Sequence, residues 1–69
     1  MPEVKSFAGY GSPESLYGDS SLSREEKISG LRTWRAMVRR SRDLSALDPA
    51  AARDLLAQIE RMLTELRRG

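Results

Sequence analysis

The feature that most constrains this chain is an apolar repeat near its C-terminus. Asp48 followed by Pro49 is typical of a helix start, because the aspartate can cap the helix and proline has no N–H to leave unpaired in the first turn. Beyond them, apolar residues recur at spacings of three and four and fall within about 120° of arc on a helix: Ala52, Leu55, Leu56, Ile59, Met62, Leu63 and Leu66. The sequence therefore predicts an amphipathic helix over residues 49–68, with one stripe that another element must cover.

A second strong signal lies in the middle of the chain. Ser23 is followed three residues later by Glu26, so that the hydroxyl and the carboxylate can each pair with a backbone N–H at a helix start. From there the apolar residues again follow a helical period: Ile28, Leu31, Trp34, Met37 and Val38. This pattern predicts a helix over residues 24–42.

The N-terminal part of the chain has weaker signals. Ser12 before Pro13 predicts one helical turn over residues 13–17, displaying Leu16 and Tyr17. Residues 1–11 show neither a helical nor a strand period, and we interpret them as a flexible arm. We expect residues 12–69 to form a single small helical domain.

These elements predict an all-α fold, an antiparallel two-helix hairpin with a short N-terminal helical turn. The chain has 69 residues and no cysteine, so disulfides and thiolate metal sites cannot compensate for a small core. Oligomerisation remains as a stabiliser, and we expect two hairpins to pair into a homodimeric four-helix bundle. The candidate interface residues are the apolar ones at helical spacing: Leu16, Tyr17, Ile28, Leu31, Trp34, Met37, Val38, Leu55, Ile59, Met62 and Leu66.

Positive charge is concentrated on the first long helix. The formal net charge of the chain is only +2, but five arginines form a basic patch on this helix: Arg32, Arg35, Arg39, Arg40 and Arg42. Arginines on one helical face can contact nucleic-acid phosphates. They also commonly flank a core, with their alkyl stems on it and their charged groups in water. We favour the second interpretation. Together with the small core, it leads us to expect a non-enzymatic, homo-oligomeric protein-interaction module, and the alternative is a nucleic-acid-associated protein that uses this basic patch.

Catalytic elements are missing from the pattern. We find no nucleophile paired with a base, no metal-ligand cluster and no glycine-rich phosphate loop, and the chain has no histidine. The sequence therefore predicts no enzymatic activity, no cofactor and no metal. No apolar stretch approaches the roughly 20 residues that span a bilayer, and no secretory signal is recognisable, so we expect a cytoplasmic protein that does not associate with membranes.

The region that begins the first long helix carries a resemblance. It follows the pattern Leu-Ser-x-Glu-x-Lys-Ile-x-x-Leu-x-x-Trp, formed here by Leu22, Ser23, Glu25, Lys27, Ile28, Leu31 and Trp34. This pattern resembles one in short proteobacterial proteins without an assigned activity, and the similar part extends from Phe7 to Leu66. Those proteins tend to carry an acidic residue after the tryptophan, whereas this chain has Arg35. The resemblance implies a bacterial source and a small helical fold.

Overall fold

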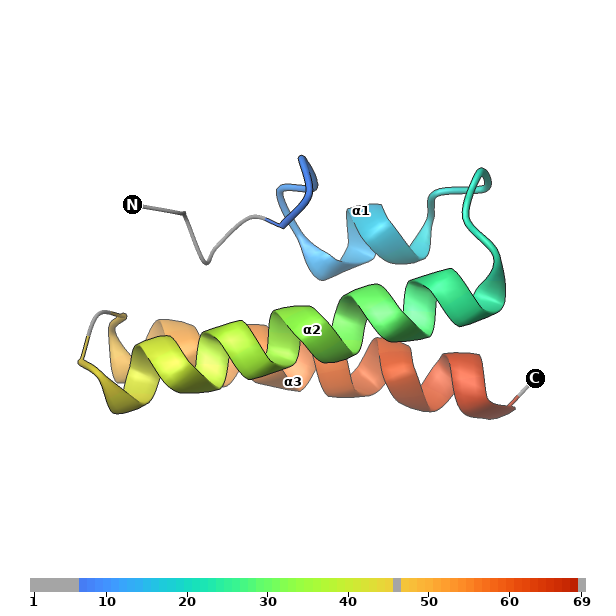
Figure 1. Ribbon diagram of the computed structural model, residues 1–69. Coiled ribbons are helices and arrows are strands. Elements are labelled where there is room, and N and C mark those ends of the chain that lie inside the picture. Colours follow the sequence, from blue (N-terminus) through green and yellow to red (C-terminus); the bar gives the residue numbers. More distant parts are fainter. Residues whose placement is uncertain (1–6, 46, 69) are drawn as a thin grey trace.

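The computed structural model describes residues 7–45 and 47–68, and within them it is all-helical. Three helices follow one another along the chain: α1 (Pro13–Tyr17), α2 (Arg24–Asp43) and α3 (Pro49–Arg68) (Figure 1). The predicted all-α fold is thus confirmed. The end of α2 lies one residue beyond the predicted one, and the other helix bounds agree with the prediction.

Side chains at the helix starts explain these bounds. At α2, Ser23 Oγ accepts a hydrogen bond from the Glu26 N–H at 3.1 Å, and Glu26 Oε1 accepts one from the Ser23 N–H at 2.8 Å, which completes a capping box. At α3, Asp48 Oδ2 accepts from the Ala51 N–H at 3.1 Å. Ser12 Oγ does the same for the Ser15 N–H at the start of α1. Each side chain satisfies a backbone donor that has no partner within its helix.

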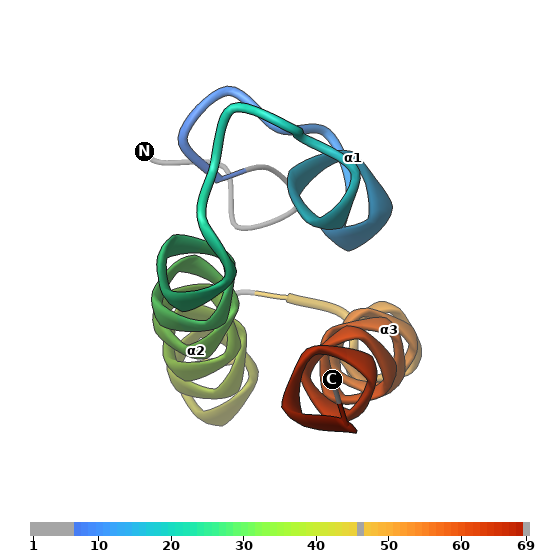
Figure 2. The same cartoon turned by 90° about the vertical axis from the view of Figure 1, so that its right-hand side faces the viewer.

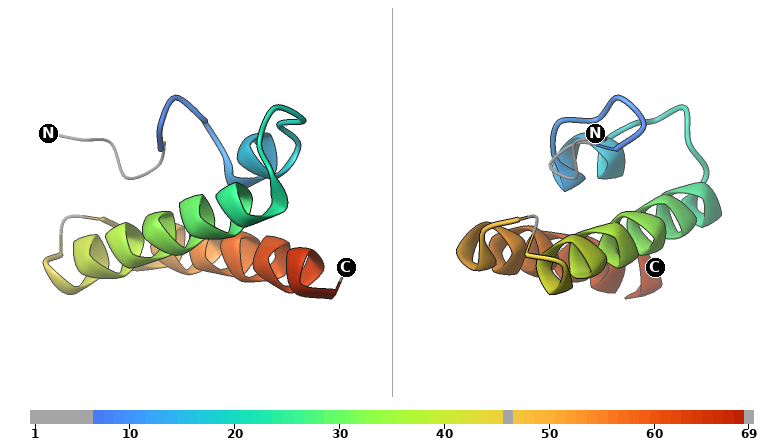
Figure 3. Two further views of the ribbon diagram at one scale, coloured as in Figure 1. Left: turned by 45° about the vertical axis from the view of Figure 1, so that its right-hand side comes forward. Right: turned by 60° about the vertical axis from the view of Figure 1, so that its left-hand side comes forward.

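The two long helices lie side by side and run in opposite directions, joined by a short connection (Figure 1). The much shorter α1 packs against both of them and covers one face of this hairpin (Figures 2 and 3). The opposite face of the hairpin is not covered by α1. The arrangement is therefore a hairpin with a lid on one side.

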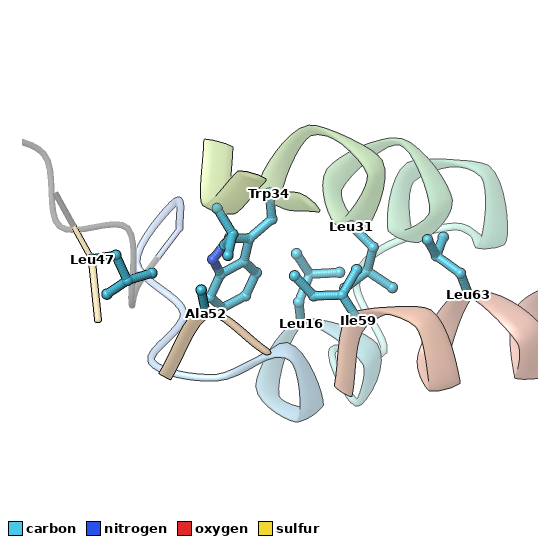
Figure 4. Packing of buried hydrophobic residues seen from close by; sticks show 8 residues of the cluster. Leu16, Leu31, Trp34, Leu47, Ala52, Ile59 and Leu63 are labelled. Atoms are coloured by element: carbon cyan, nitrogen blue, oxygen red, sulfur yellow. The ribbon is translucent and has the colours of Figure 1, made fainter. Parts of the chain in front are cut away.

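The core lies where the three helices meet (Figure 4). Trp34 projects from α2 toward α3 and is fully buried, with Ala52 and Ile59 beside it on the facing helix. Every helix contributes to this core, whose members are Leu16, Leu31, Trp34, Val38, Leu47, Ala52, Ile59 and Leu63. Leu16 is the contribution of α1, which supplies a third side that two helices alone lack.

Residues 7–10 form a tight turn that packs on the helices. Two backbone hydrogen bonds of 3.0 and 2.8 Å join Phe7 and Tyr10, and Ala8 and Gly9 take left-handed conformations with φ of 52° and 90°. The Phe7 ring stacks on Trp34, with 5.8 Å between ring centroids and 22° between planes. This corrects the expected flexible arm for these residues, because stacking on the indole opposes the entropy of a free segment. Residues 1–6 lie outside the described residues.

The chain covers its own core about as well as a folded monomer does. It exposes 4638 Å², and folded monomers of 7.8 kDa expose about 4,400 Å². Its radius of gyration is 11.6 Å, against about 11 Å for a single domain of this length. The two-helix core that looked too small from the sequence is thus completed by α1 and Phe7.

Candidate interaction surface

The structure divides the candidate interface residues into two groups. Five of them are at most 1% exposed and lie in the core of a single chain: Leu16, Leu31, Trp34, Val38 and Ile59. They present no surface to a partner. This corrects the sequence-based assignment, which placed Trp34 and Leu16 where a second copy would cover them, because α1 and Phe7 already cover the indole.

The other six candidates are partly exposed: Tyr17, Ile28, Met37, Leu55, Met62 and Leu66. Tyr17 has a neighbour of its own, since Lys27 Nζ lies 5.6 Å from the centre of its ring. Among the residues described, Leu44 is the one large apolar residue that is mostly exposed, at 68%. The surface therefore has scattered apolar side chains and little continuous apolar area.

The basic patch is organised around a salt bridge between the two long helices. Arg35 Nη1 lies 2.6 Å from Glu60 Oε1 of α3, and the arginine side chain is only 20% exposed. Sequence reasoning placed Arg35 on the edge of the core but did not find its partner. Which α3 residue faces Arg35 depends on the register between the helices, which no local pattern reveals.

Two further arginines act on the same carboxylate. The hydrogen bond from Arg35 lowers the pKa of Glu60; partial burial opposes this, and the charges of Arg35, Arg39 and Arg67 lower the pKa further. Arg67 belongs to α3 and was not predicted as part of the patch. Arg67 follows Glu60 by seven residues, or two helical turns, and this spacing could have indicated that both lie on the same side of α3.

This surface lies on the open face of the hairpin. On α2, Gly30 faces α1, because a Cβ built there would be 3.2 Å from Leu16 Cδ1. At about 100° per residue, Arg32 and Arg39 lie roughly 160° and 180° around the helix from Gly30. On α3, Ala51 borders α1, and Glu60 lies roughly 180° from it by the same arithmetic. The charged residues therefore face away from the lid.

Two apolar side chains lie among these charges. In projection Ile28 lies about 20° from Arg35, and Leu56 lies about 40° from Glu60; both are partly exposed and pack against the core. We call this surface the arginine seam, defined by Ile28, Arg32, Arg35, Arg39, Leu56, Glu60 and Arg67. Four arginines and one glutamate give it a charge of +3 (4 − 1). The exposed Glu25, about 20° from Arg32 in projection, and the exposed Arg53, about 20° from Glu60, flank the seam with opposite charges that cancel.

Two arginines of the predicted patch remain, of which Arg40 points away from the seam and Arg42 continues its line at the end of α2. Arg40 is exposed and about 100° around α2 from Arg39, so it points away from the seam. Arg42 lies at the C-terminal end of α2 and is 3.4 Å from Asp43. Arg24 lies outside the predicted patch. It begins α2 and donates from Nε to the carbonyl oxygen of Leu66 near the end of α3. The structure thus brings together Arg32, Arg35 and Arg39 and separates Arg40 from them.

A polar cluster on the lid side holds the N-terminal turn in place. The Tyr10 hydroxyl donates to Asp19 Oδ2, while Oδ1 of the same carboxylate accepts from the Ser21 hydroxyl at 2.6 Å and the Ser21 N–H at 2.9 Å. The bonds from Ser21 and Tyr10 lower the pKa of Asp19 to about 2. The bond to Asp19 raises the pKa of Tyr10. These groups join the turn at Tyr10 to the α1–α2 connection and are fully explained by that structural role.

Other kinds of site find little support in the described part of the chain. No group of three or more His, Cys, Asp or Glu side chains there could hold a metal ion. A hollow of about 450 Å³ lies between the N-terminal turn and α2, with Phe7, Leu16 and Gly30 in its wall and Glu26 as its one ionisable carboxylate. None of the helices in this part is long and apolar enough to cross a membrane.

No family model, curated protein or solved structure matches this chain. The resemblance carried by the motif around Trp34 stays a prediction. The case for a function therefore depends on the surfaces of this chain.

Proposed function

We propose that this protein is a small, non-enzymatic protein-interaction module that binds its partner through the arginine seam. The observation that supports this most is the one-sided lid. One face of the hairpin is covered by α1 and Phe7, and the other presents charged residues around the partly exposed Ile28 and Leu56. Apolar side chains within a polar surround are typical of protein interfaces.

Site-specific photocrosslinking in cells of the source organism tests this proposal. A photoreactive residue at Leu56 is expected to crosslink to a partner of constant mass. The same residue at Asp54, which is exposed and about 160° away on α3, should not. The captured partner, once identified and purified, should bind the wild-type chain directly. Equal crosslinking from both positions, or none from Leu56, would contradict the proposal.

A homodimeric four-helix bundle is the second candidate. It is favoured by the partly exposed Met62 and Leu66 in the second half of α3, which an antiparallel second copy would cover. Leu55, on the same side of α3, lies beside Ser12 and Pro13. The small core expected from the sequence gives the dimer less support, because a single chain exposes about the area expected of a folded monomer.

Light scattering across a wide concentration range tests the dimer. A homodimer gives a mass of twice 7.8 kDa, and its melting temperature rises with protein concentration, because association stabilises the folded state by mass action. A mass that stays at that of one chain, with a melting temperature independent of concentration, would reject this candidate.

A further inference from the structure

We infer that the arginine seam accepts an acidic amphipathic helix of a partner protein, packed along the open face that α2 and α3 share. This inference rests on the proposed function and specifies the chemistry of its partner.

The seam is complementary in charge to an acidic partner. The seam carries +3, and its central glutamate is already neutralised by Arg35 at 2.6 Å. Arg39 and Arg67 act on the same carboxylate from two different helices, so both helices contribute positive charge to this face. A partner with carboxylates on both flanks would meet an arginine on each side, and guanidinium groups bind carboxylates with two parallel hydrogen bonds.

The seam also offers two apolar side chains to a partner. Ile28 and Leu56 come from different helices and are partly exposed within the seam. A helix laid along this face would bury its apolar stripe on them and extend the bundle on the side that α1 leaves open (Figure 2). The residues of α2 from Arg24 to Arg42 span about 27 Å at 1.5 Å per residue, which is the length of a partner helix of roughly 18 residues.

Nucleic acid fits this surface less well. Proteins that bind single strands stack bases on aromatic side chains, and the described aromatic residues lie on the lid side or in the core: Phe7, Tyr10, Tyr17 and Trp34. A duplex would be held by phosphate contacts alone. Those contacts leave Ile28 and Leu56 unused and meet Glu60 at the centre of the seam.

A second copy is also a poor occupant of the seam. A two-fold interface brings the same patch of each chain together, so two seams that each carry a charge of +3 would be placed against one another. Like charges placed together at an interface are strongly unfavourable. The acidic α1 is too short to act as the missing helix, since it has five residues and one carboxylate, Glu14.

A synthetic 21-residue peptide, with leucines at heptad positions a and d and glutamates at most others, tests the inference. Binding is measured by fluorescence anisotropy against the wild-type chain, the seam variant Arg32→Gln/Arg39→Gln and the control Arg40→Gln/Arg68→Gln. The two double variants lose the same charge, and all four arginines are exposed, so folding should be retained and is checked by circular dichroism. We expect the seam variant to weaken binding at least about tenfold and the control less than about twofold.

Two further probes make the result specific. A peptide of equal charge with its leucines replaced by serine should bind at least about tenfold more weakly, because it lacks the stripe for Ile28 and Leu56. A 20-base-pair DNA duplex and a 20-nucleotide RNA are measured in the same buffer over a series of salt concentrations.

Several outcomes would overturn the inference. They are equal binding of the leucine and serine peptides, equal loss in both double variants, or no binding of the leucine peptide. Tighter, steeply salt-dependent binding of DNA or RNA that needs Arg32 and Arg39 would instead assign the seam to nucleic acid. A failed peptide test with successful crosslinking from Leu56 would overturn the acidic helix alone, whereas failed crosslinking contradicts the proposed function itself.

Discussion

Replacement of Trp34 by alanine is expected to lower the free energy of unfolding by about 3–5 kcal/mol. The indole is 0% exposed, stacks on Phe7 and lies between α2 and α3, so its removal leaves a cavity that the helices cannot close without shifting. Small domains are stable by only about 5–15 kcal/mol, and we therefore expect a largely unfolded or loosely packed chain. Urea unfolding followed by circular dichroism at 222 nm measures the change.

Leu44→Ala is the matched control for this experiment. Leu44 is also a large apolar residue, but it is 68% exposed at the end of α2, and substitutions at such positions usually change stability by less than about 0.5 kcal/mol. A loss of less than about 1.5 kcal/mol for Trp34→Ala would contradict the packing described here. It would mean that the indole is not enclosed by the three helices and Phe7.

The helix bounds were predictable because the signals that set them are local. Ser23 and Glu26 are three residues apart, and the capping box that they form depends on nothing elsewhere in the chain. The same holds for Asp48, whose carboxylate accepts from the Ala51 N–H three residues later. The helical period of the apolar residues then indicated which side of each helix would be buried.

The position of the lid could not be derived in this way. Phe7 reaches Trp34 because Ala8 and Gly9 reverse the chain in left-handed conformations, and a short segment without a repeat gives no sign of such a turn. In the sequence alone, a glycine inside a helix, such as Gly30, is compatible either with a close approach of another element or with simple tolerance of glycine. The structure supports the close approach, since a Cβ there would be 3.2 Å from Leu16 Cδ1.

The arginine seam illustrates a second limit of sequence reasoning. The strip on α2 was visible from the spacing of Arg32, Arg35 and Arg39, but its relation to α3 depends on how the two helices align. That alignment places Glu60 against Arg35 and brings the charge of Arg67 to the same carboxylate. The basic patch predicted from one helix is therefore a surface shared by two, and this is why a partner that contacts both helices suits it better than one that contacts a single helix.

Leu16→Ala is expected to destabilise the chain by about 2–5 kcal/mol. Leu16 is 1% exposed and is the one leucine by which the five-residue α1 enters the core. So short a helix is not stable by itself, and its place on the hairpin depends on this contact together with Pro13 and the Tyr10–Asp19 hydrogen bond. Loss of the side chain should loosen the lid and expose the face of α2 that contains Gly30.

Thermal and urea unfolding measure this loss, and Tyr17→Ala in the same helix is the control. Tyr17 is partly exposed, so its loss should cost clearly less than that of Leu16. Amide hydrogen exchange adds a local measurement. If α1 is part of the core, exchange in Leu16→Ala should accelerate across α1 and also in the middle of α2 and α3, because all three helices share one packed cluster. Faster exchange confined to α1 would instead show that the α2–α3 hairpin is stable without its lid.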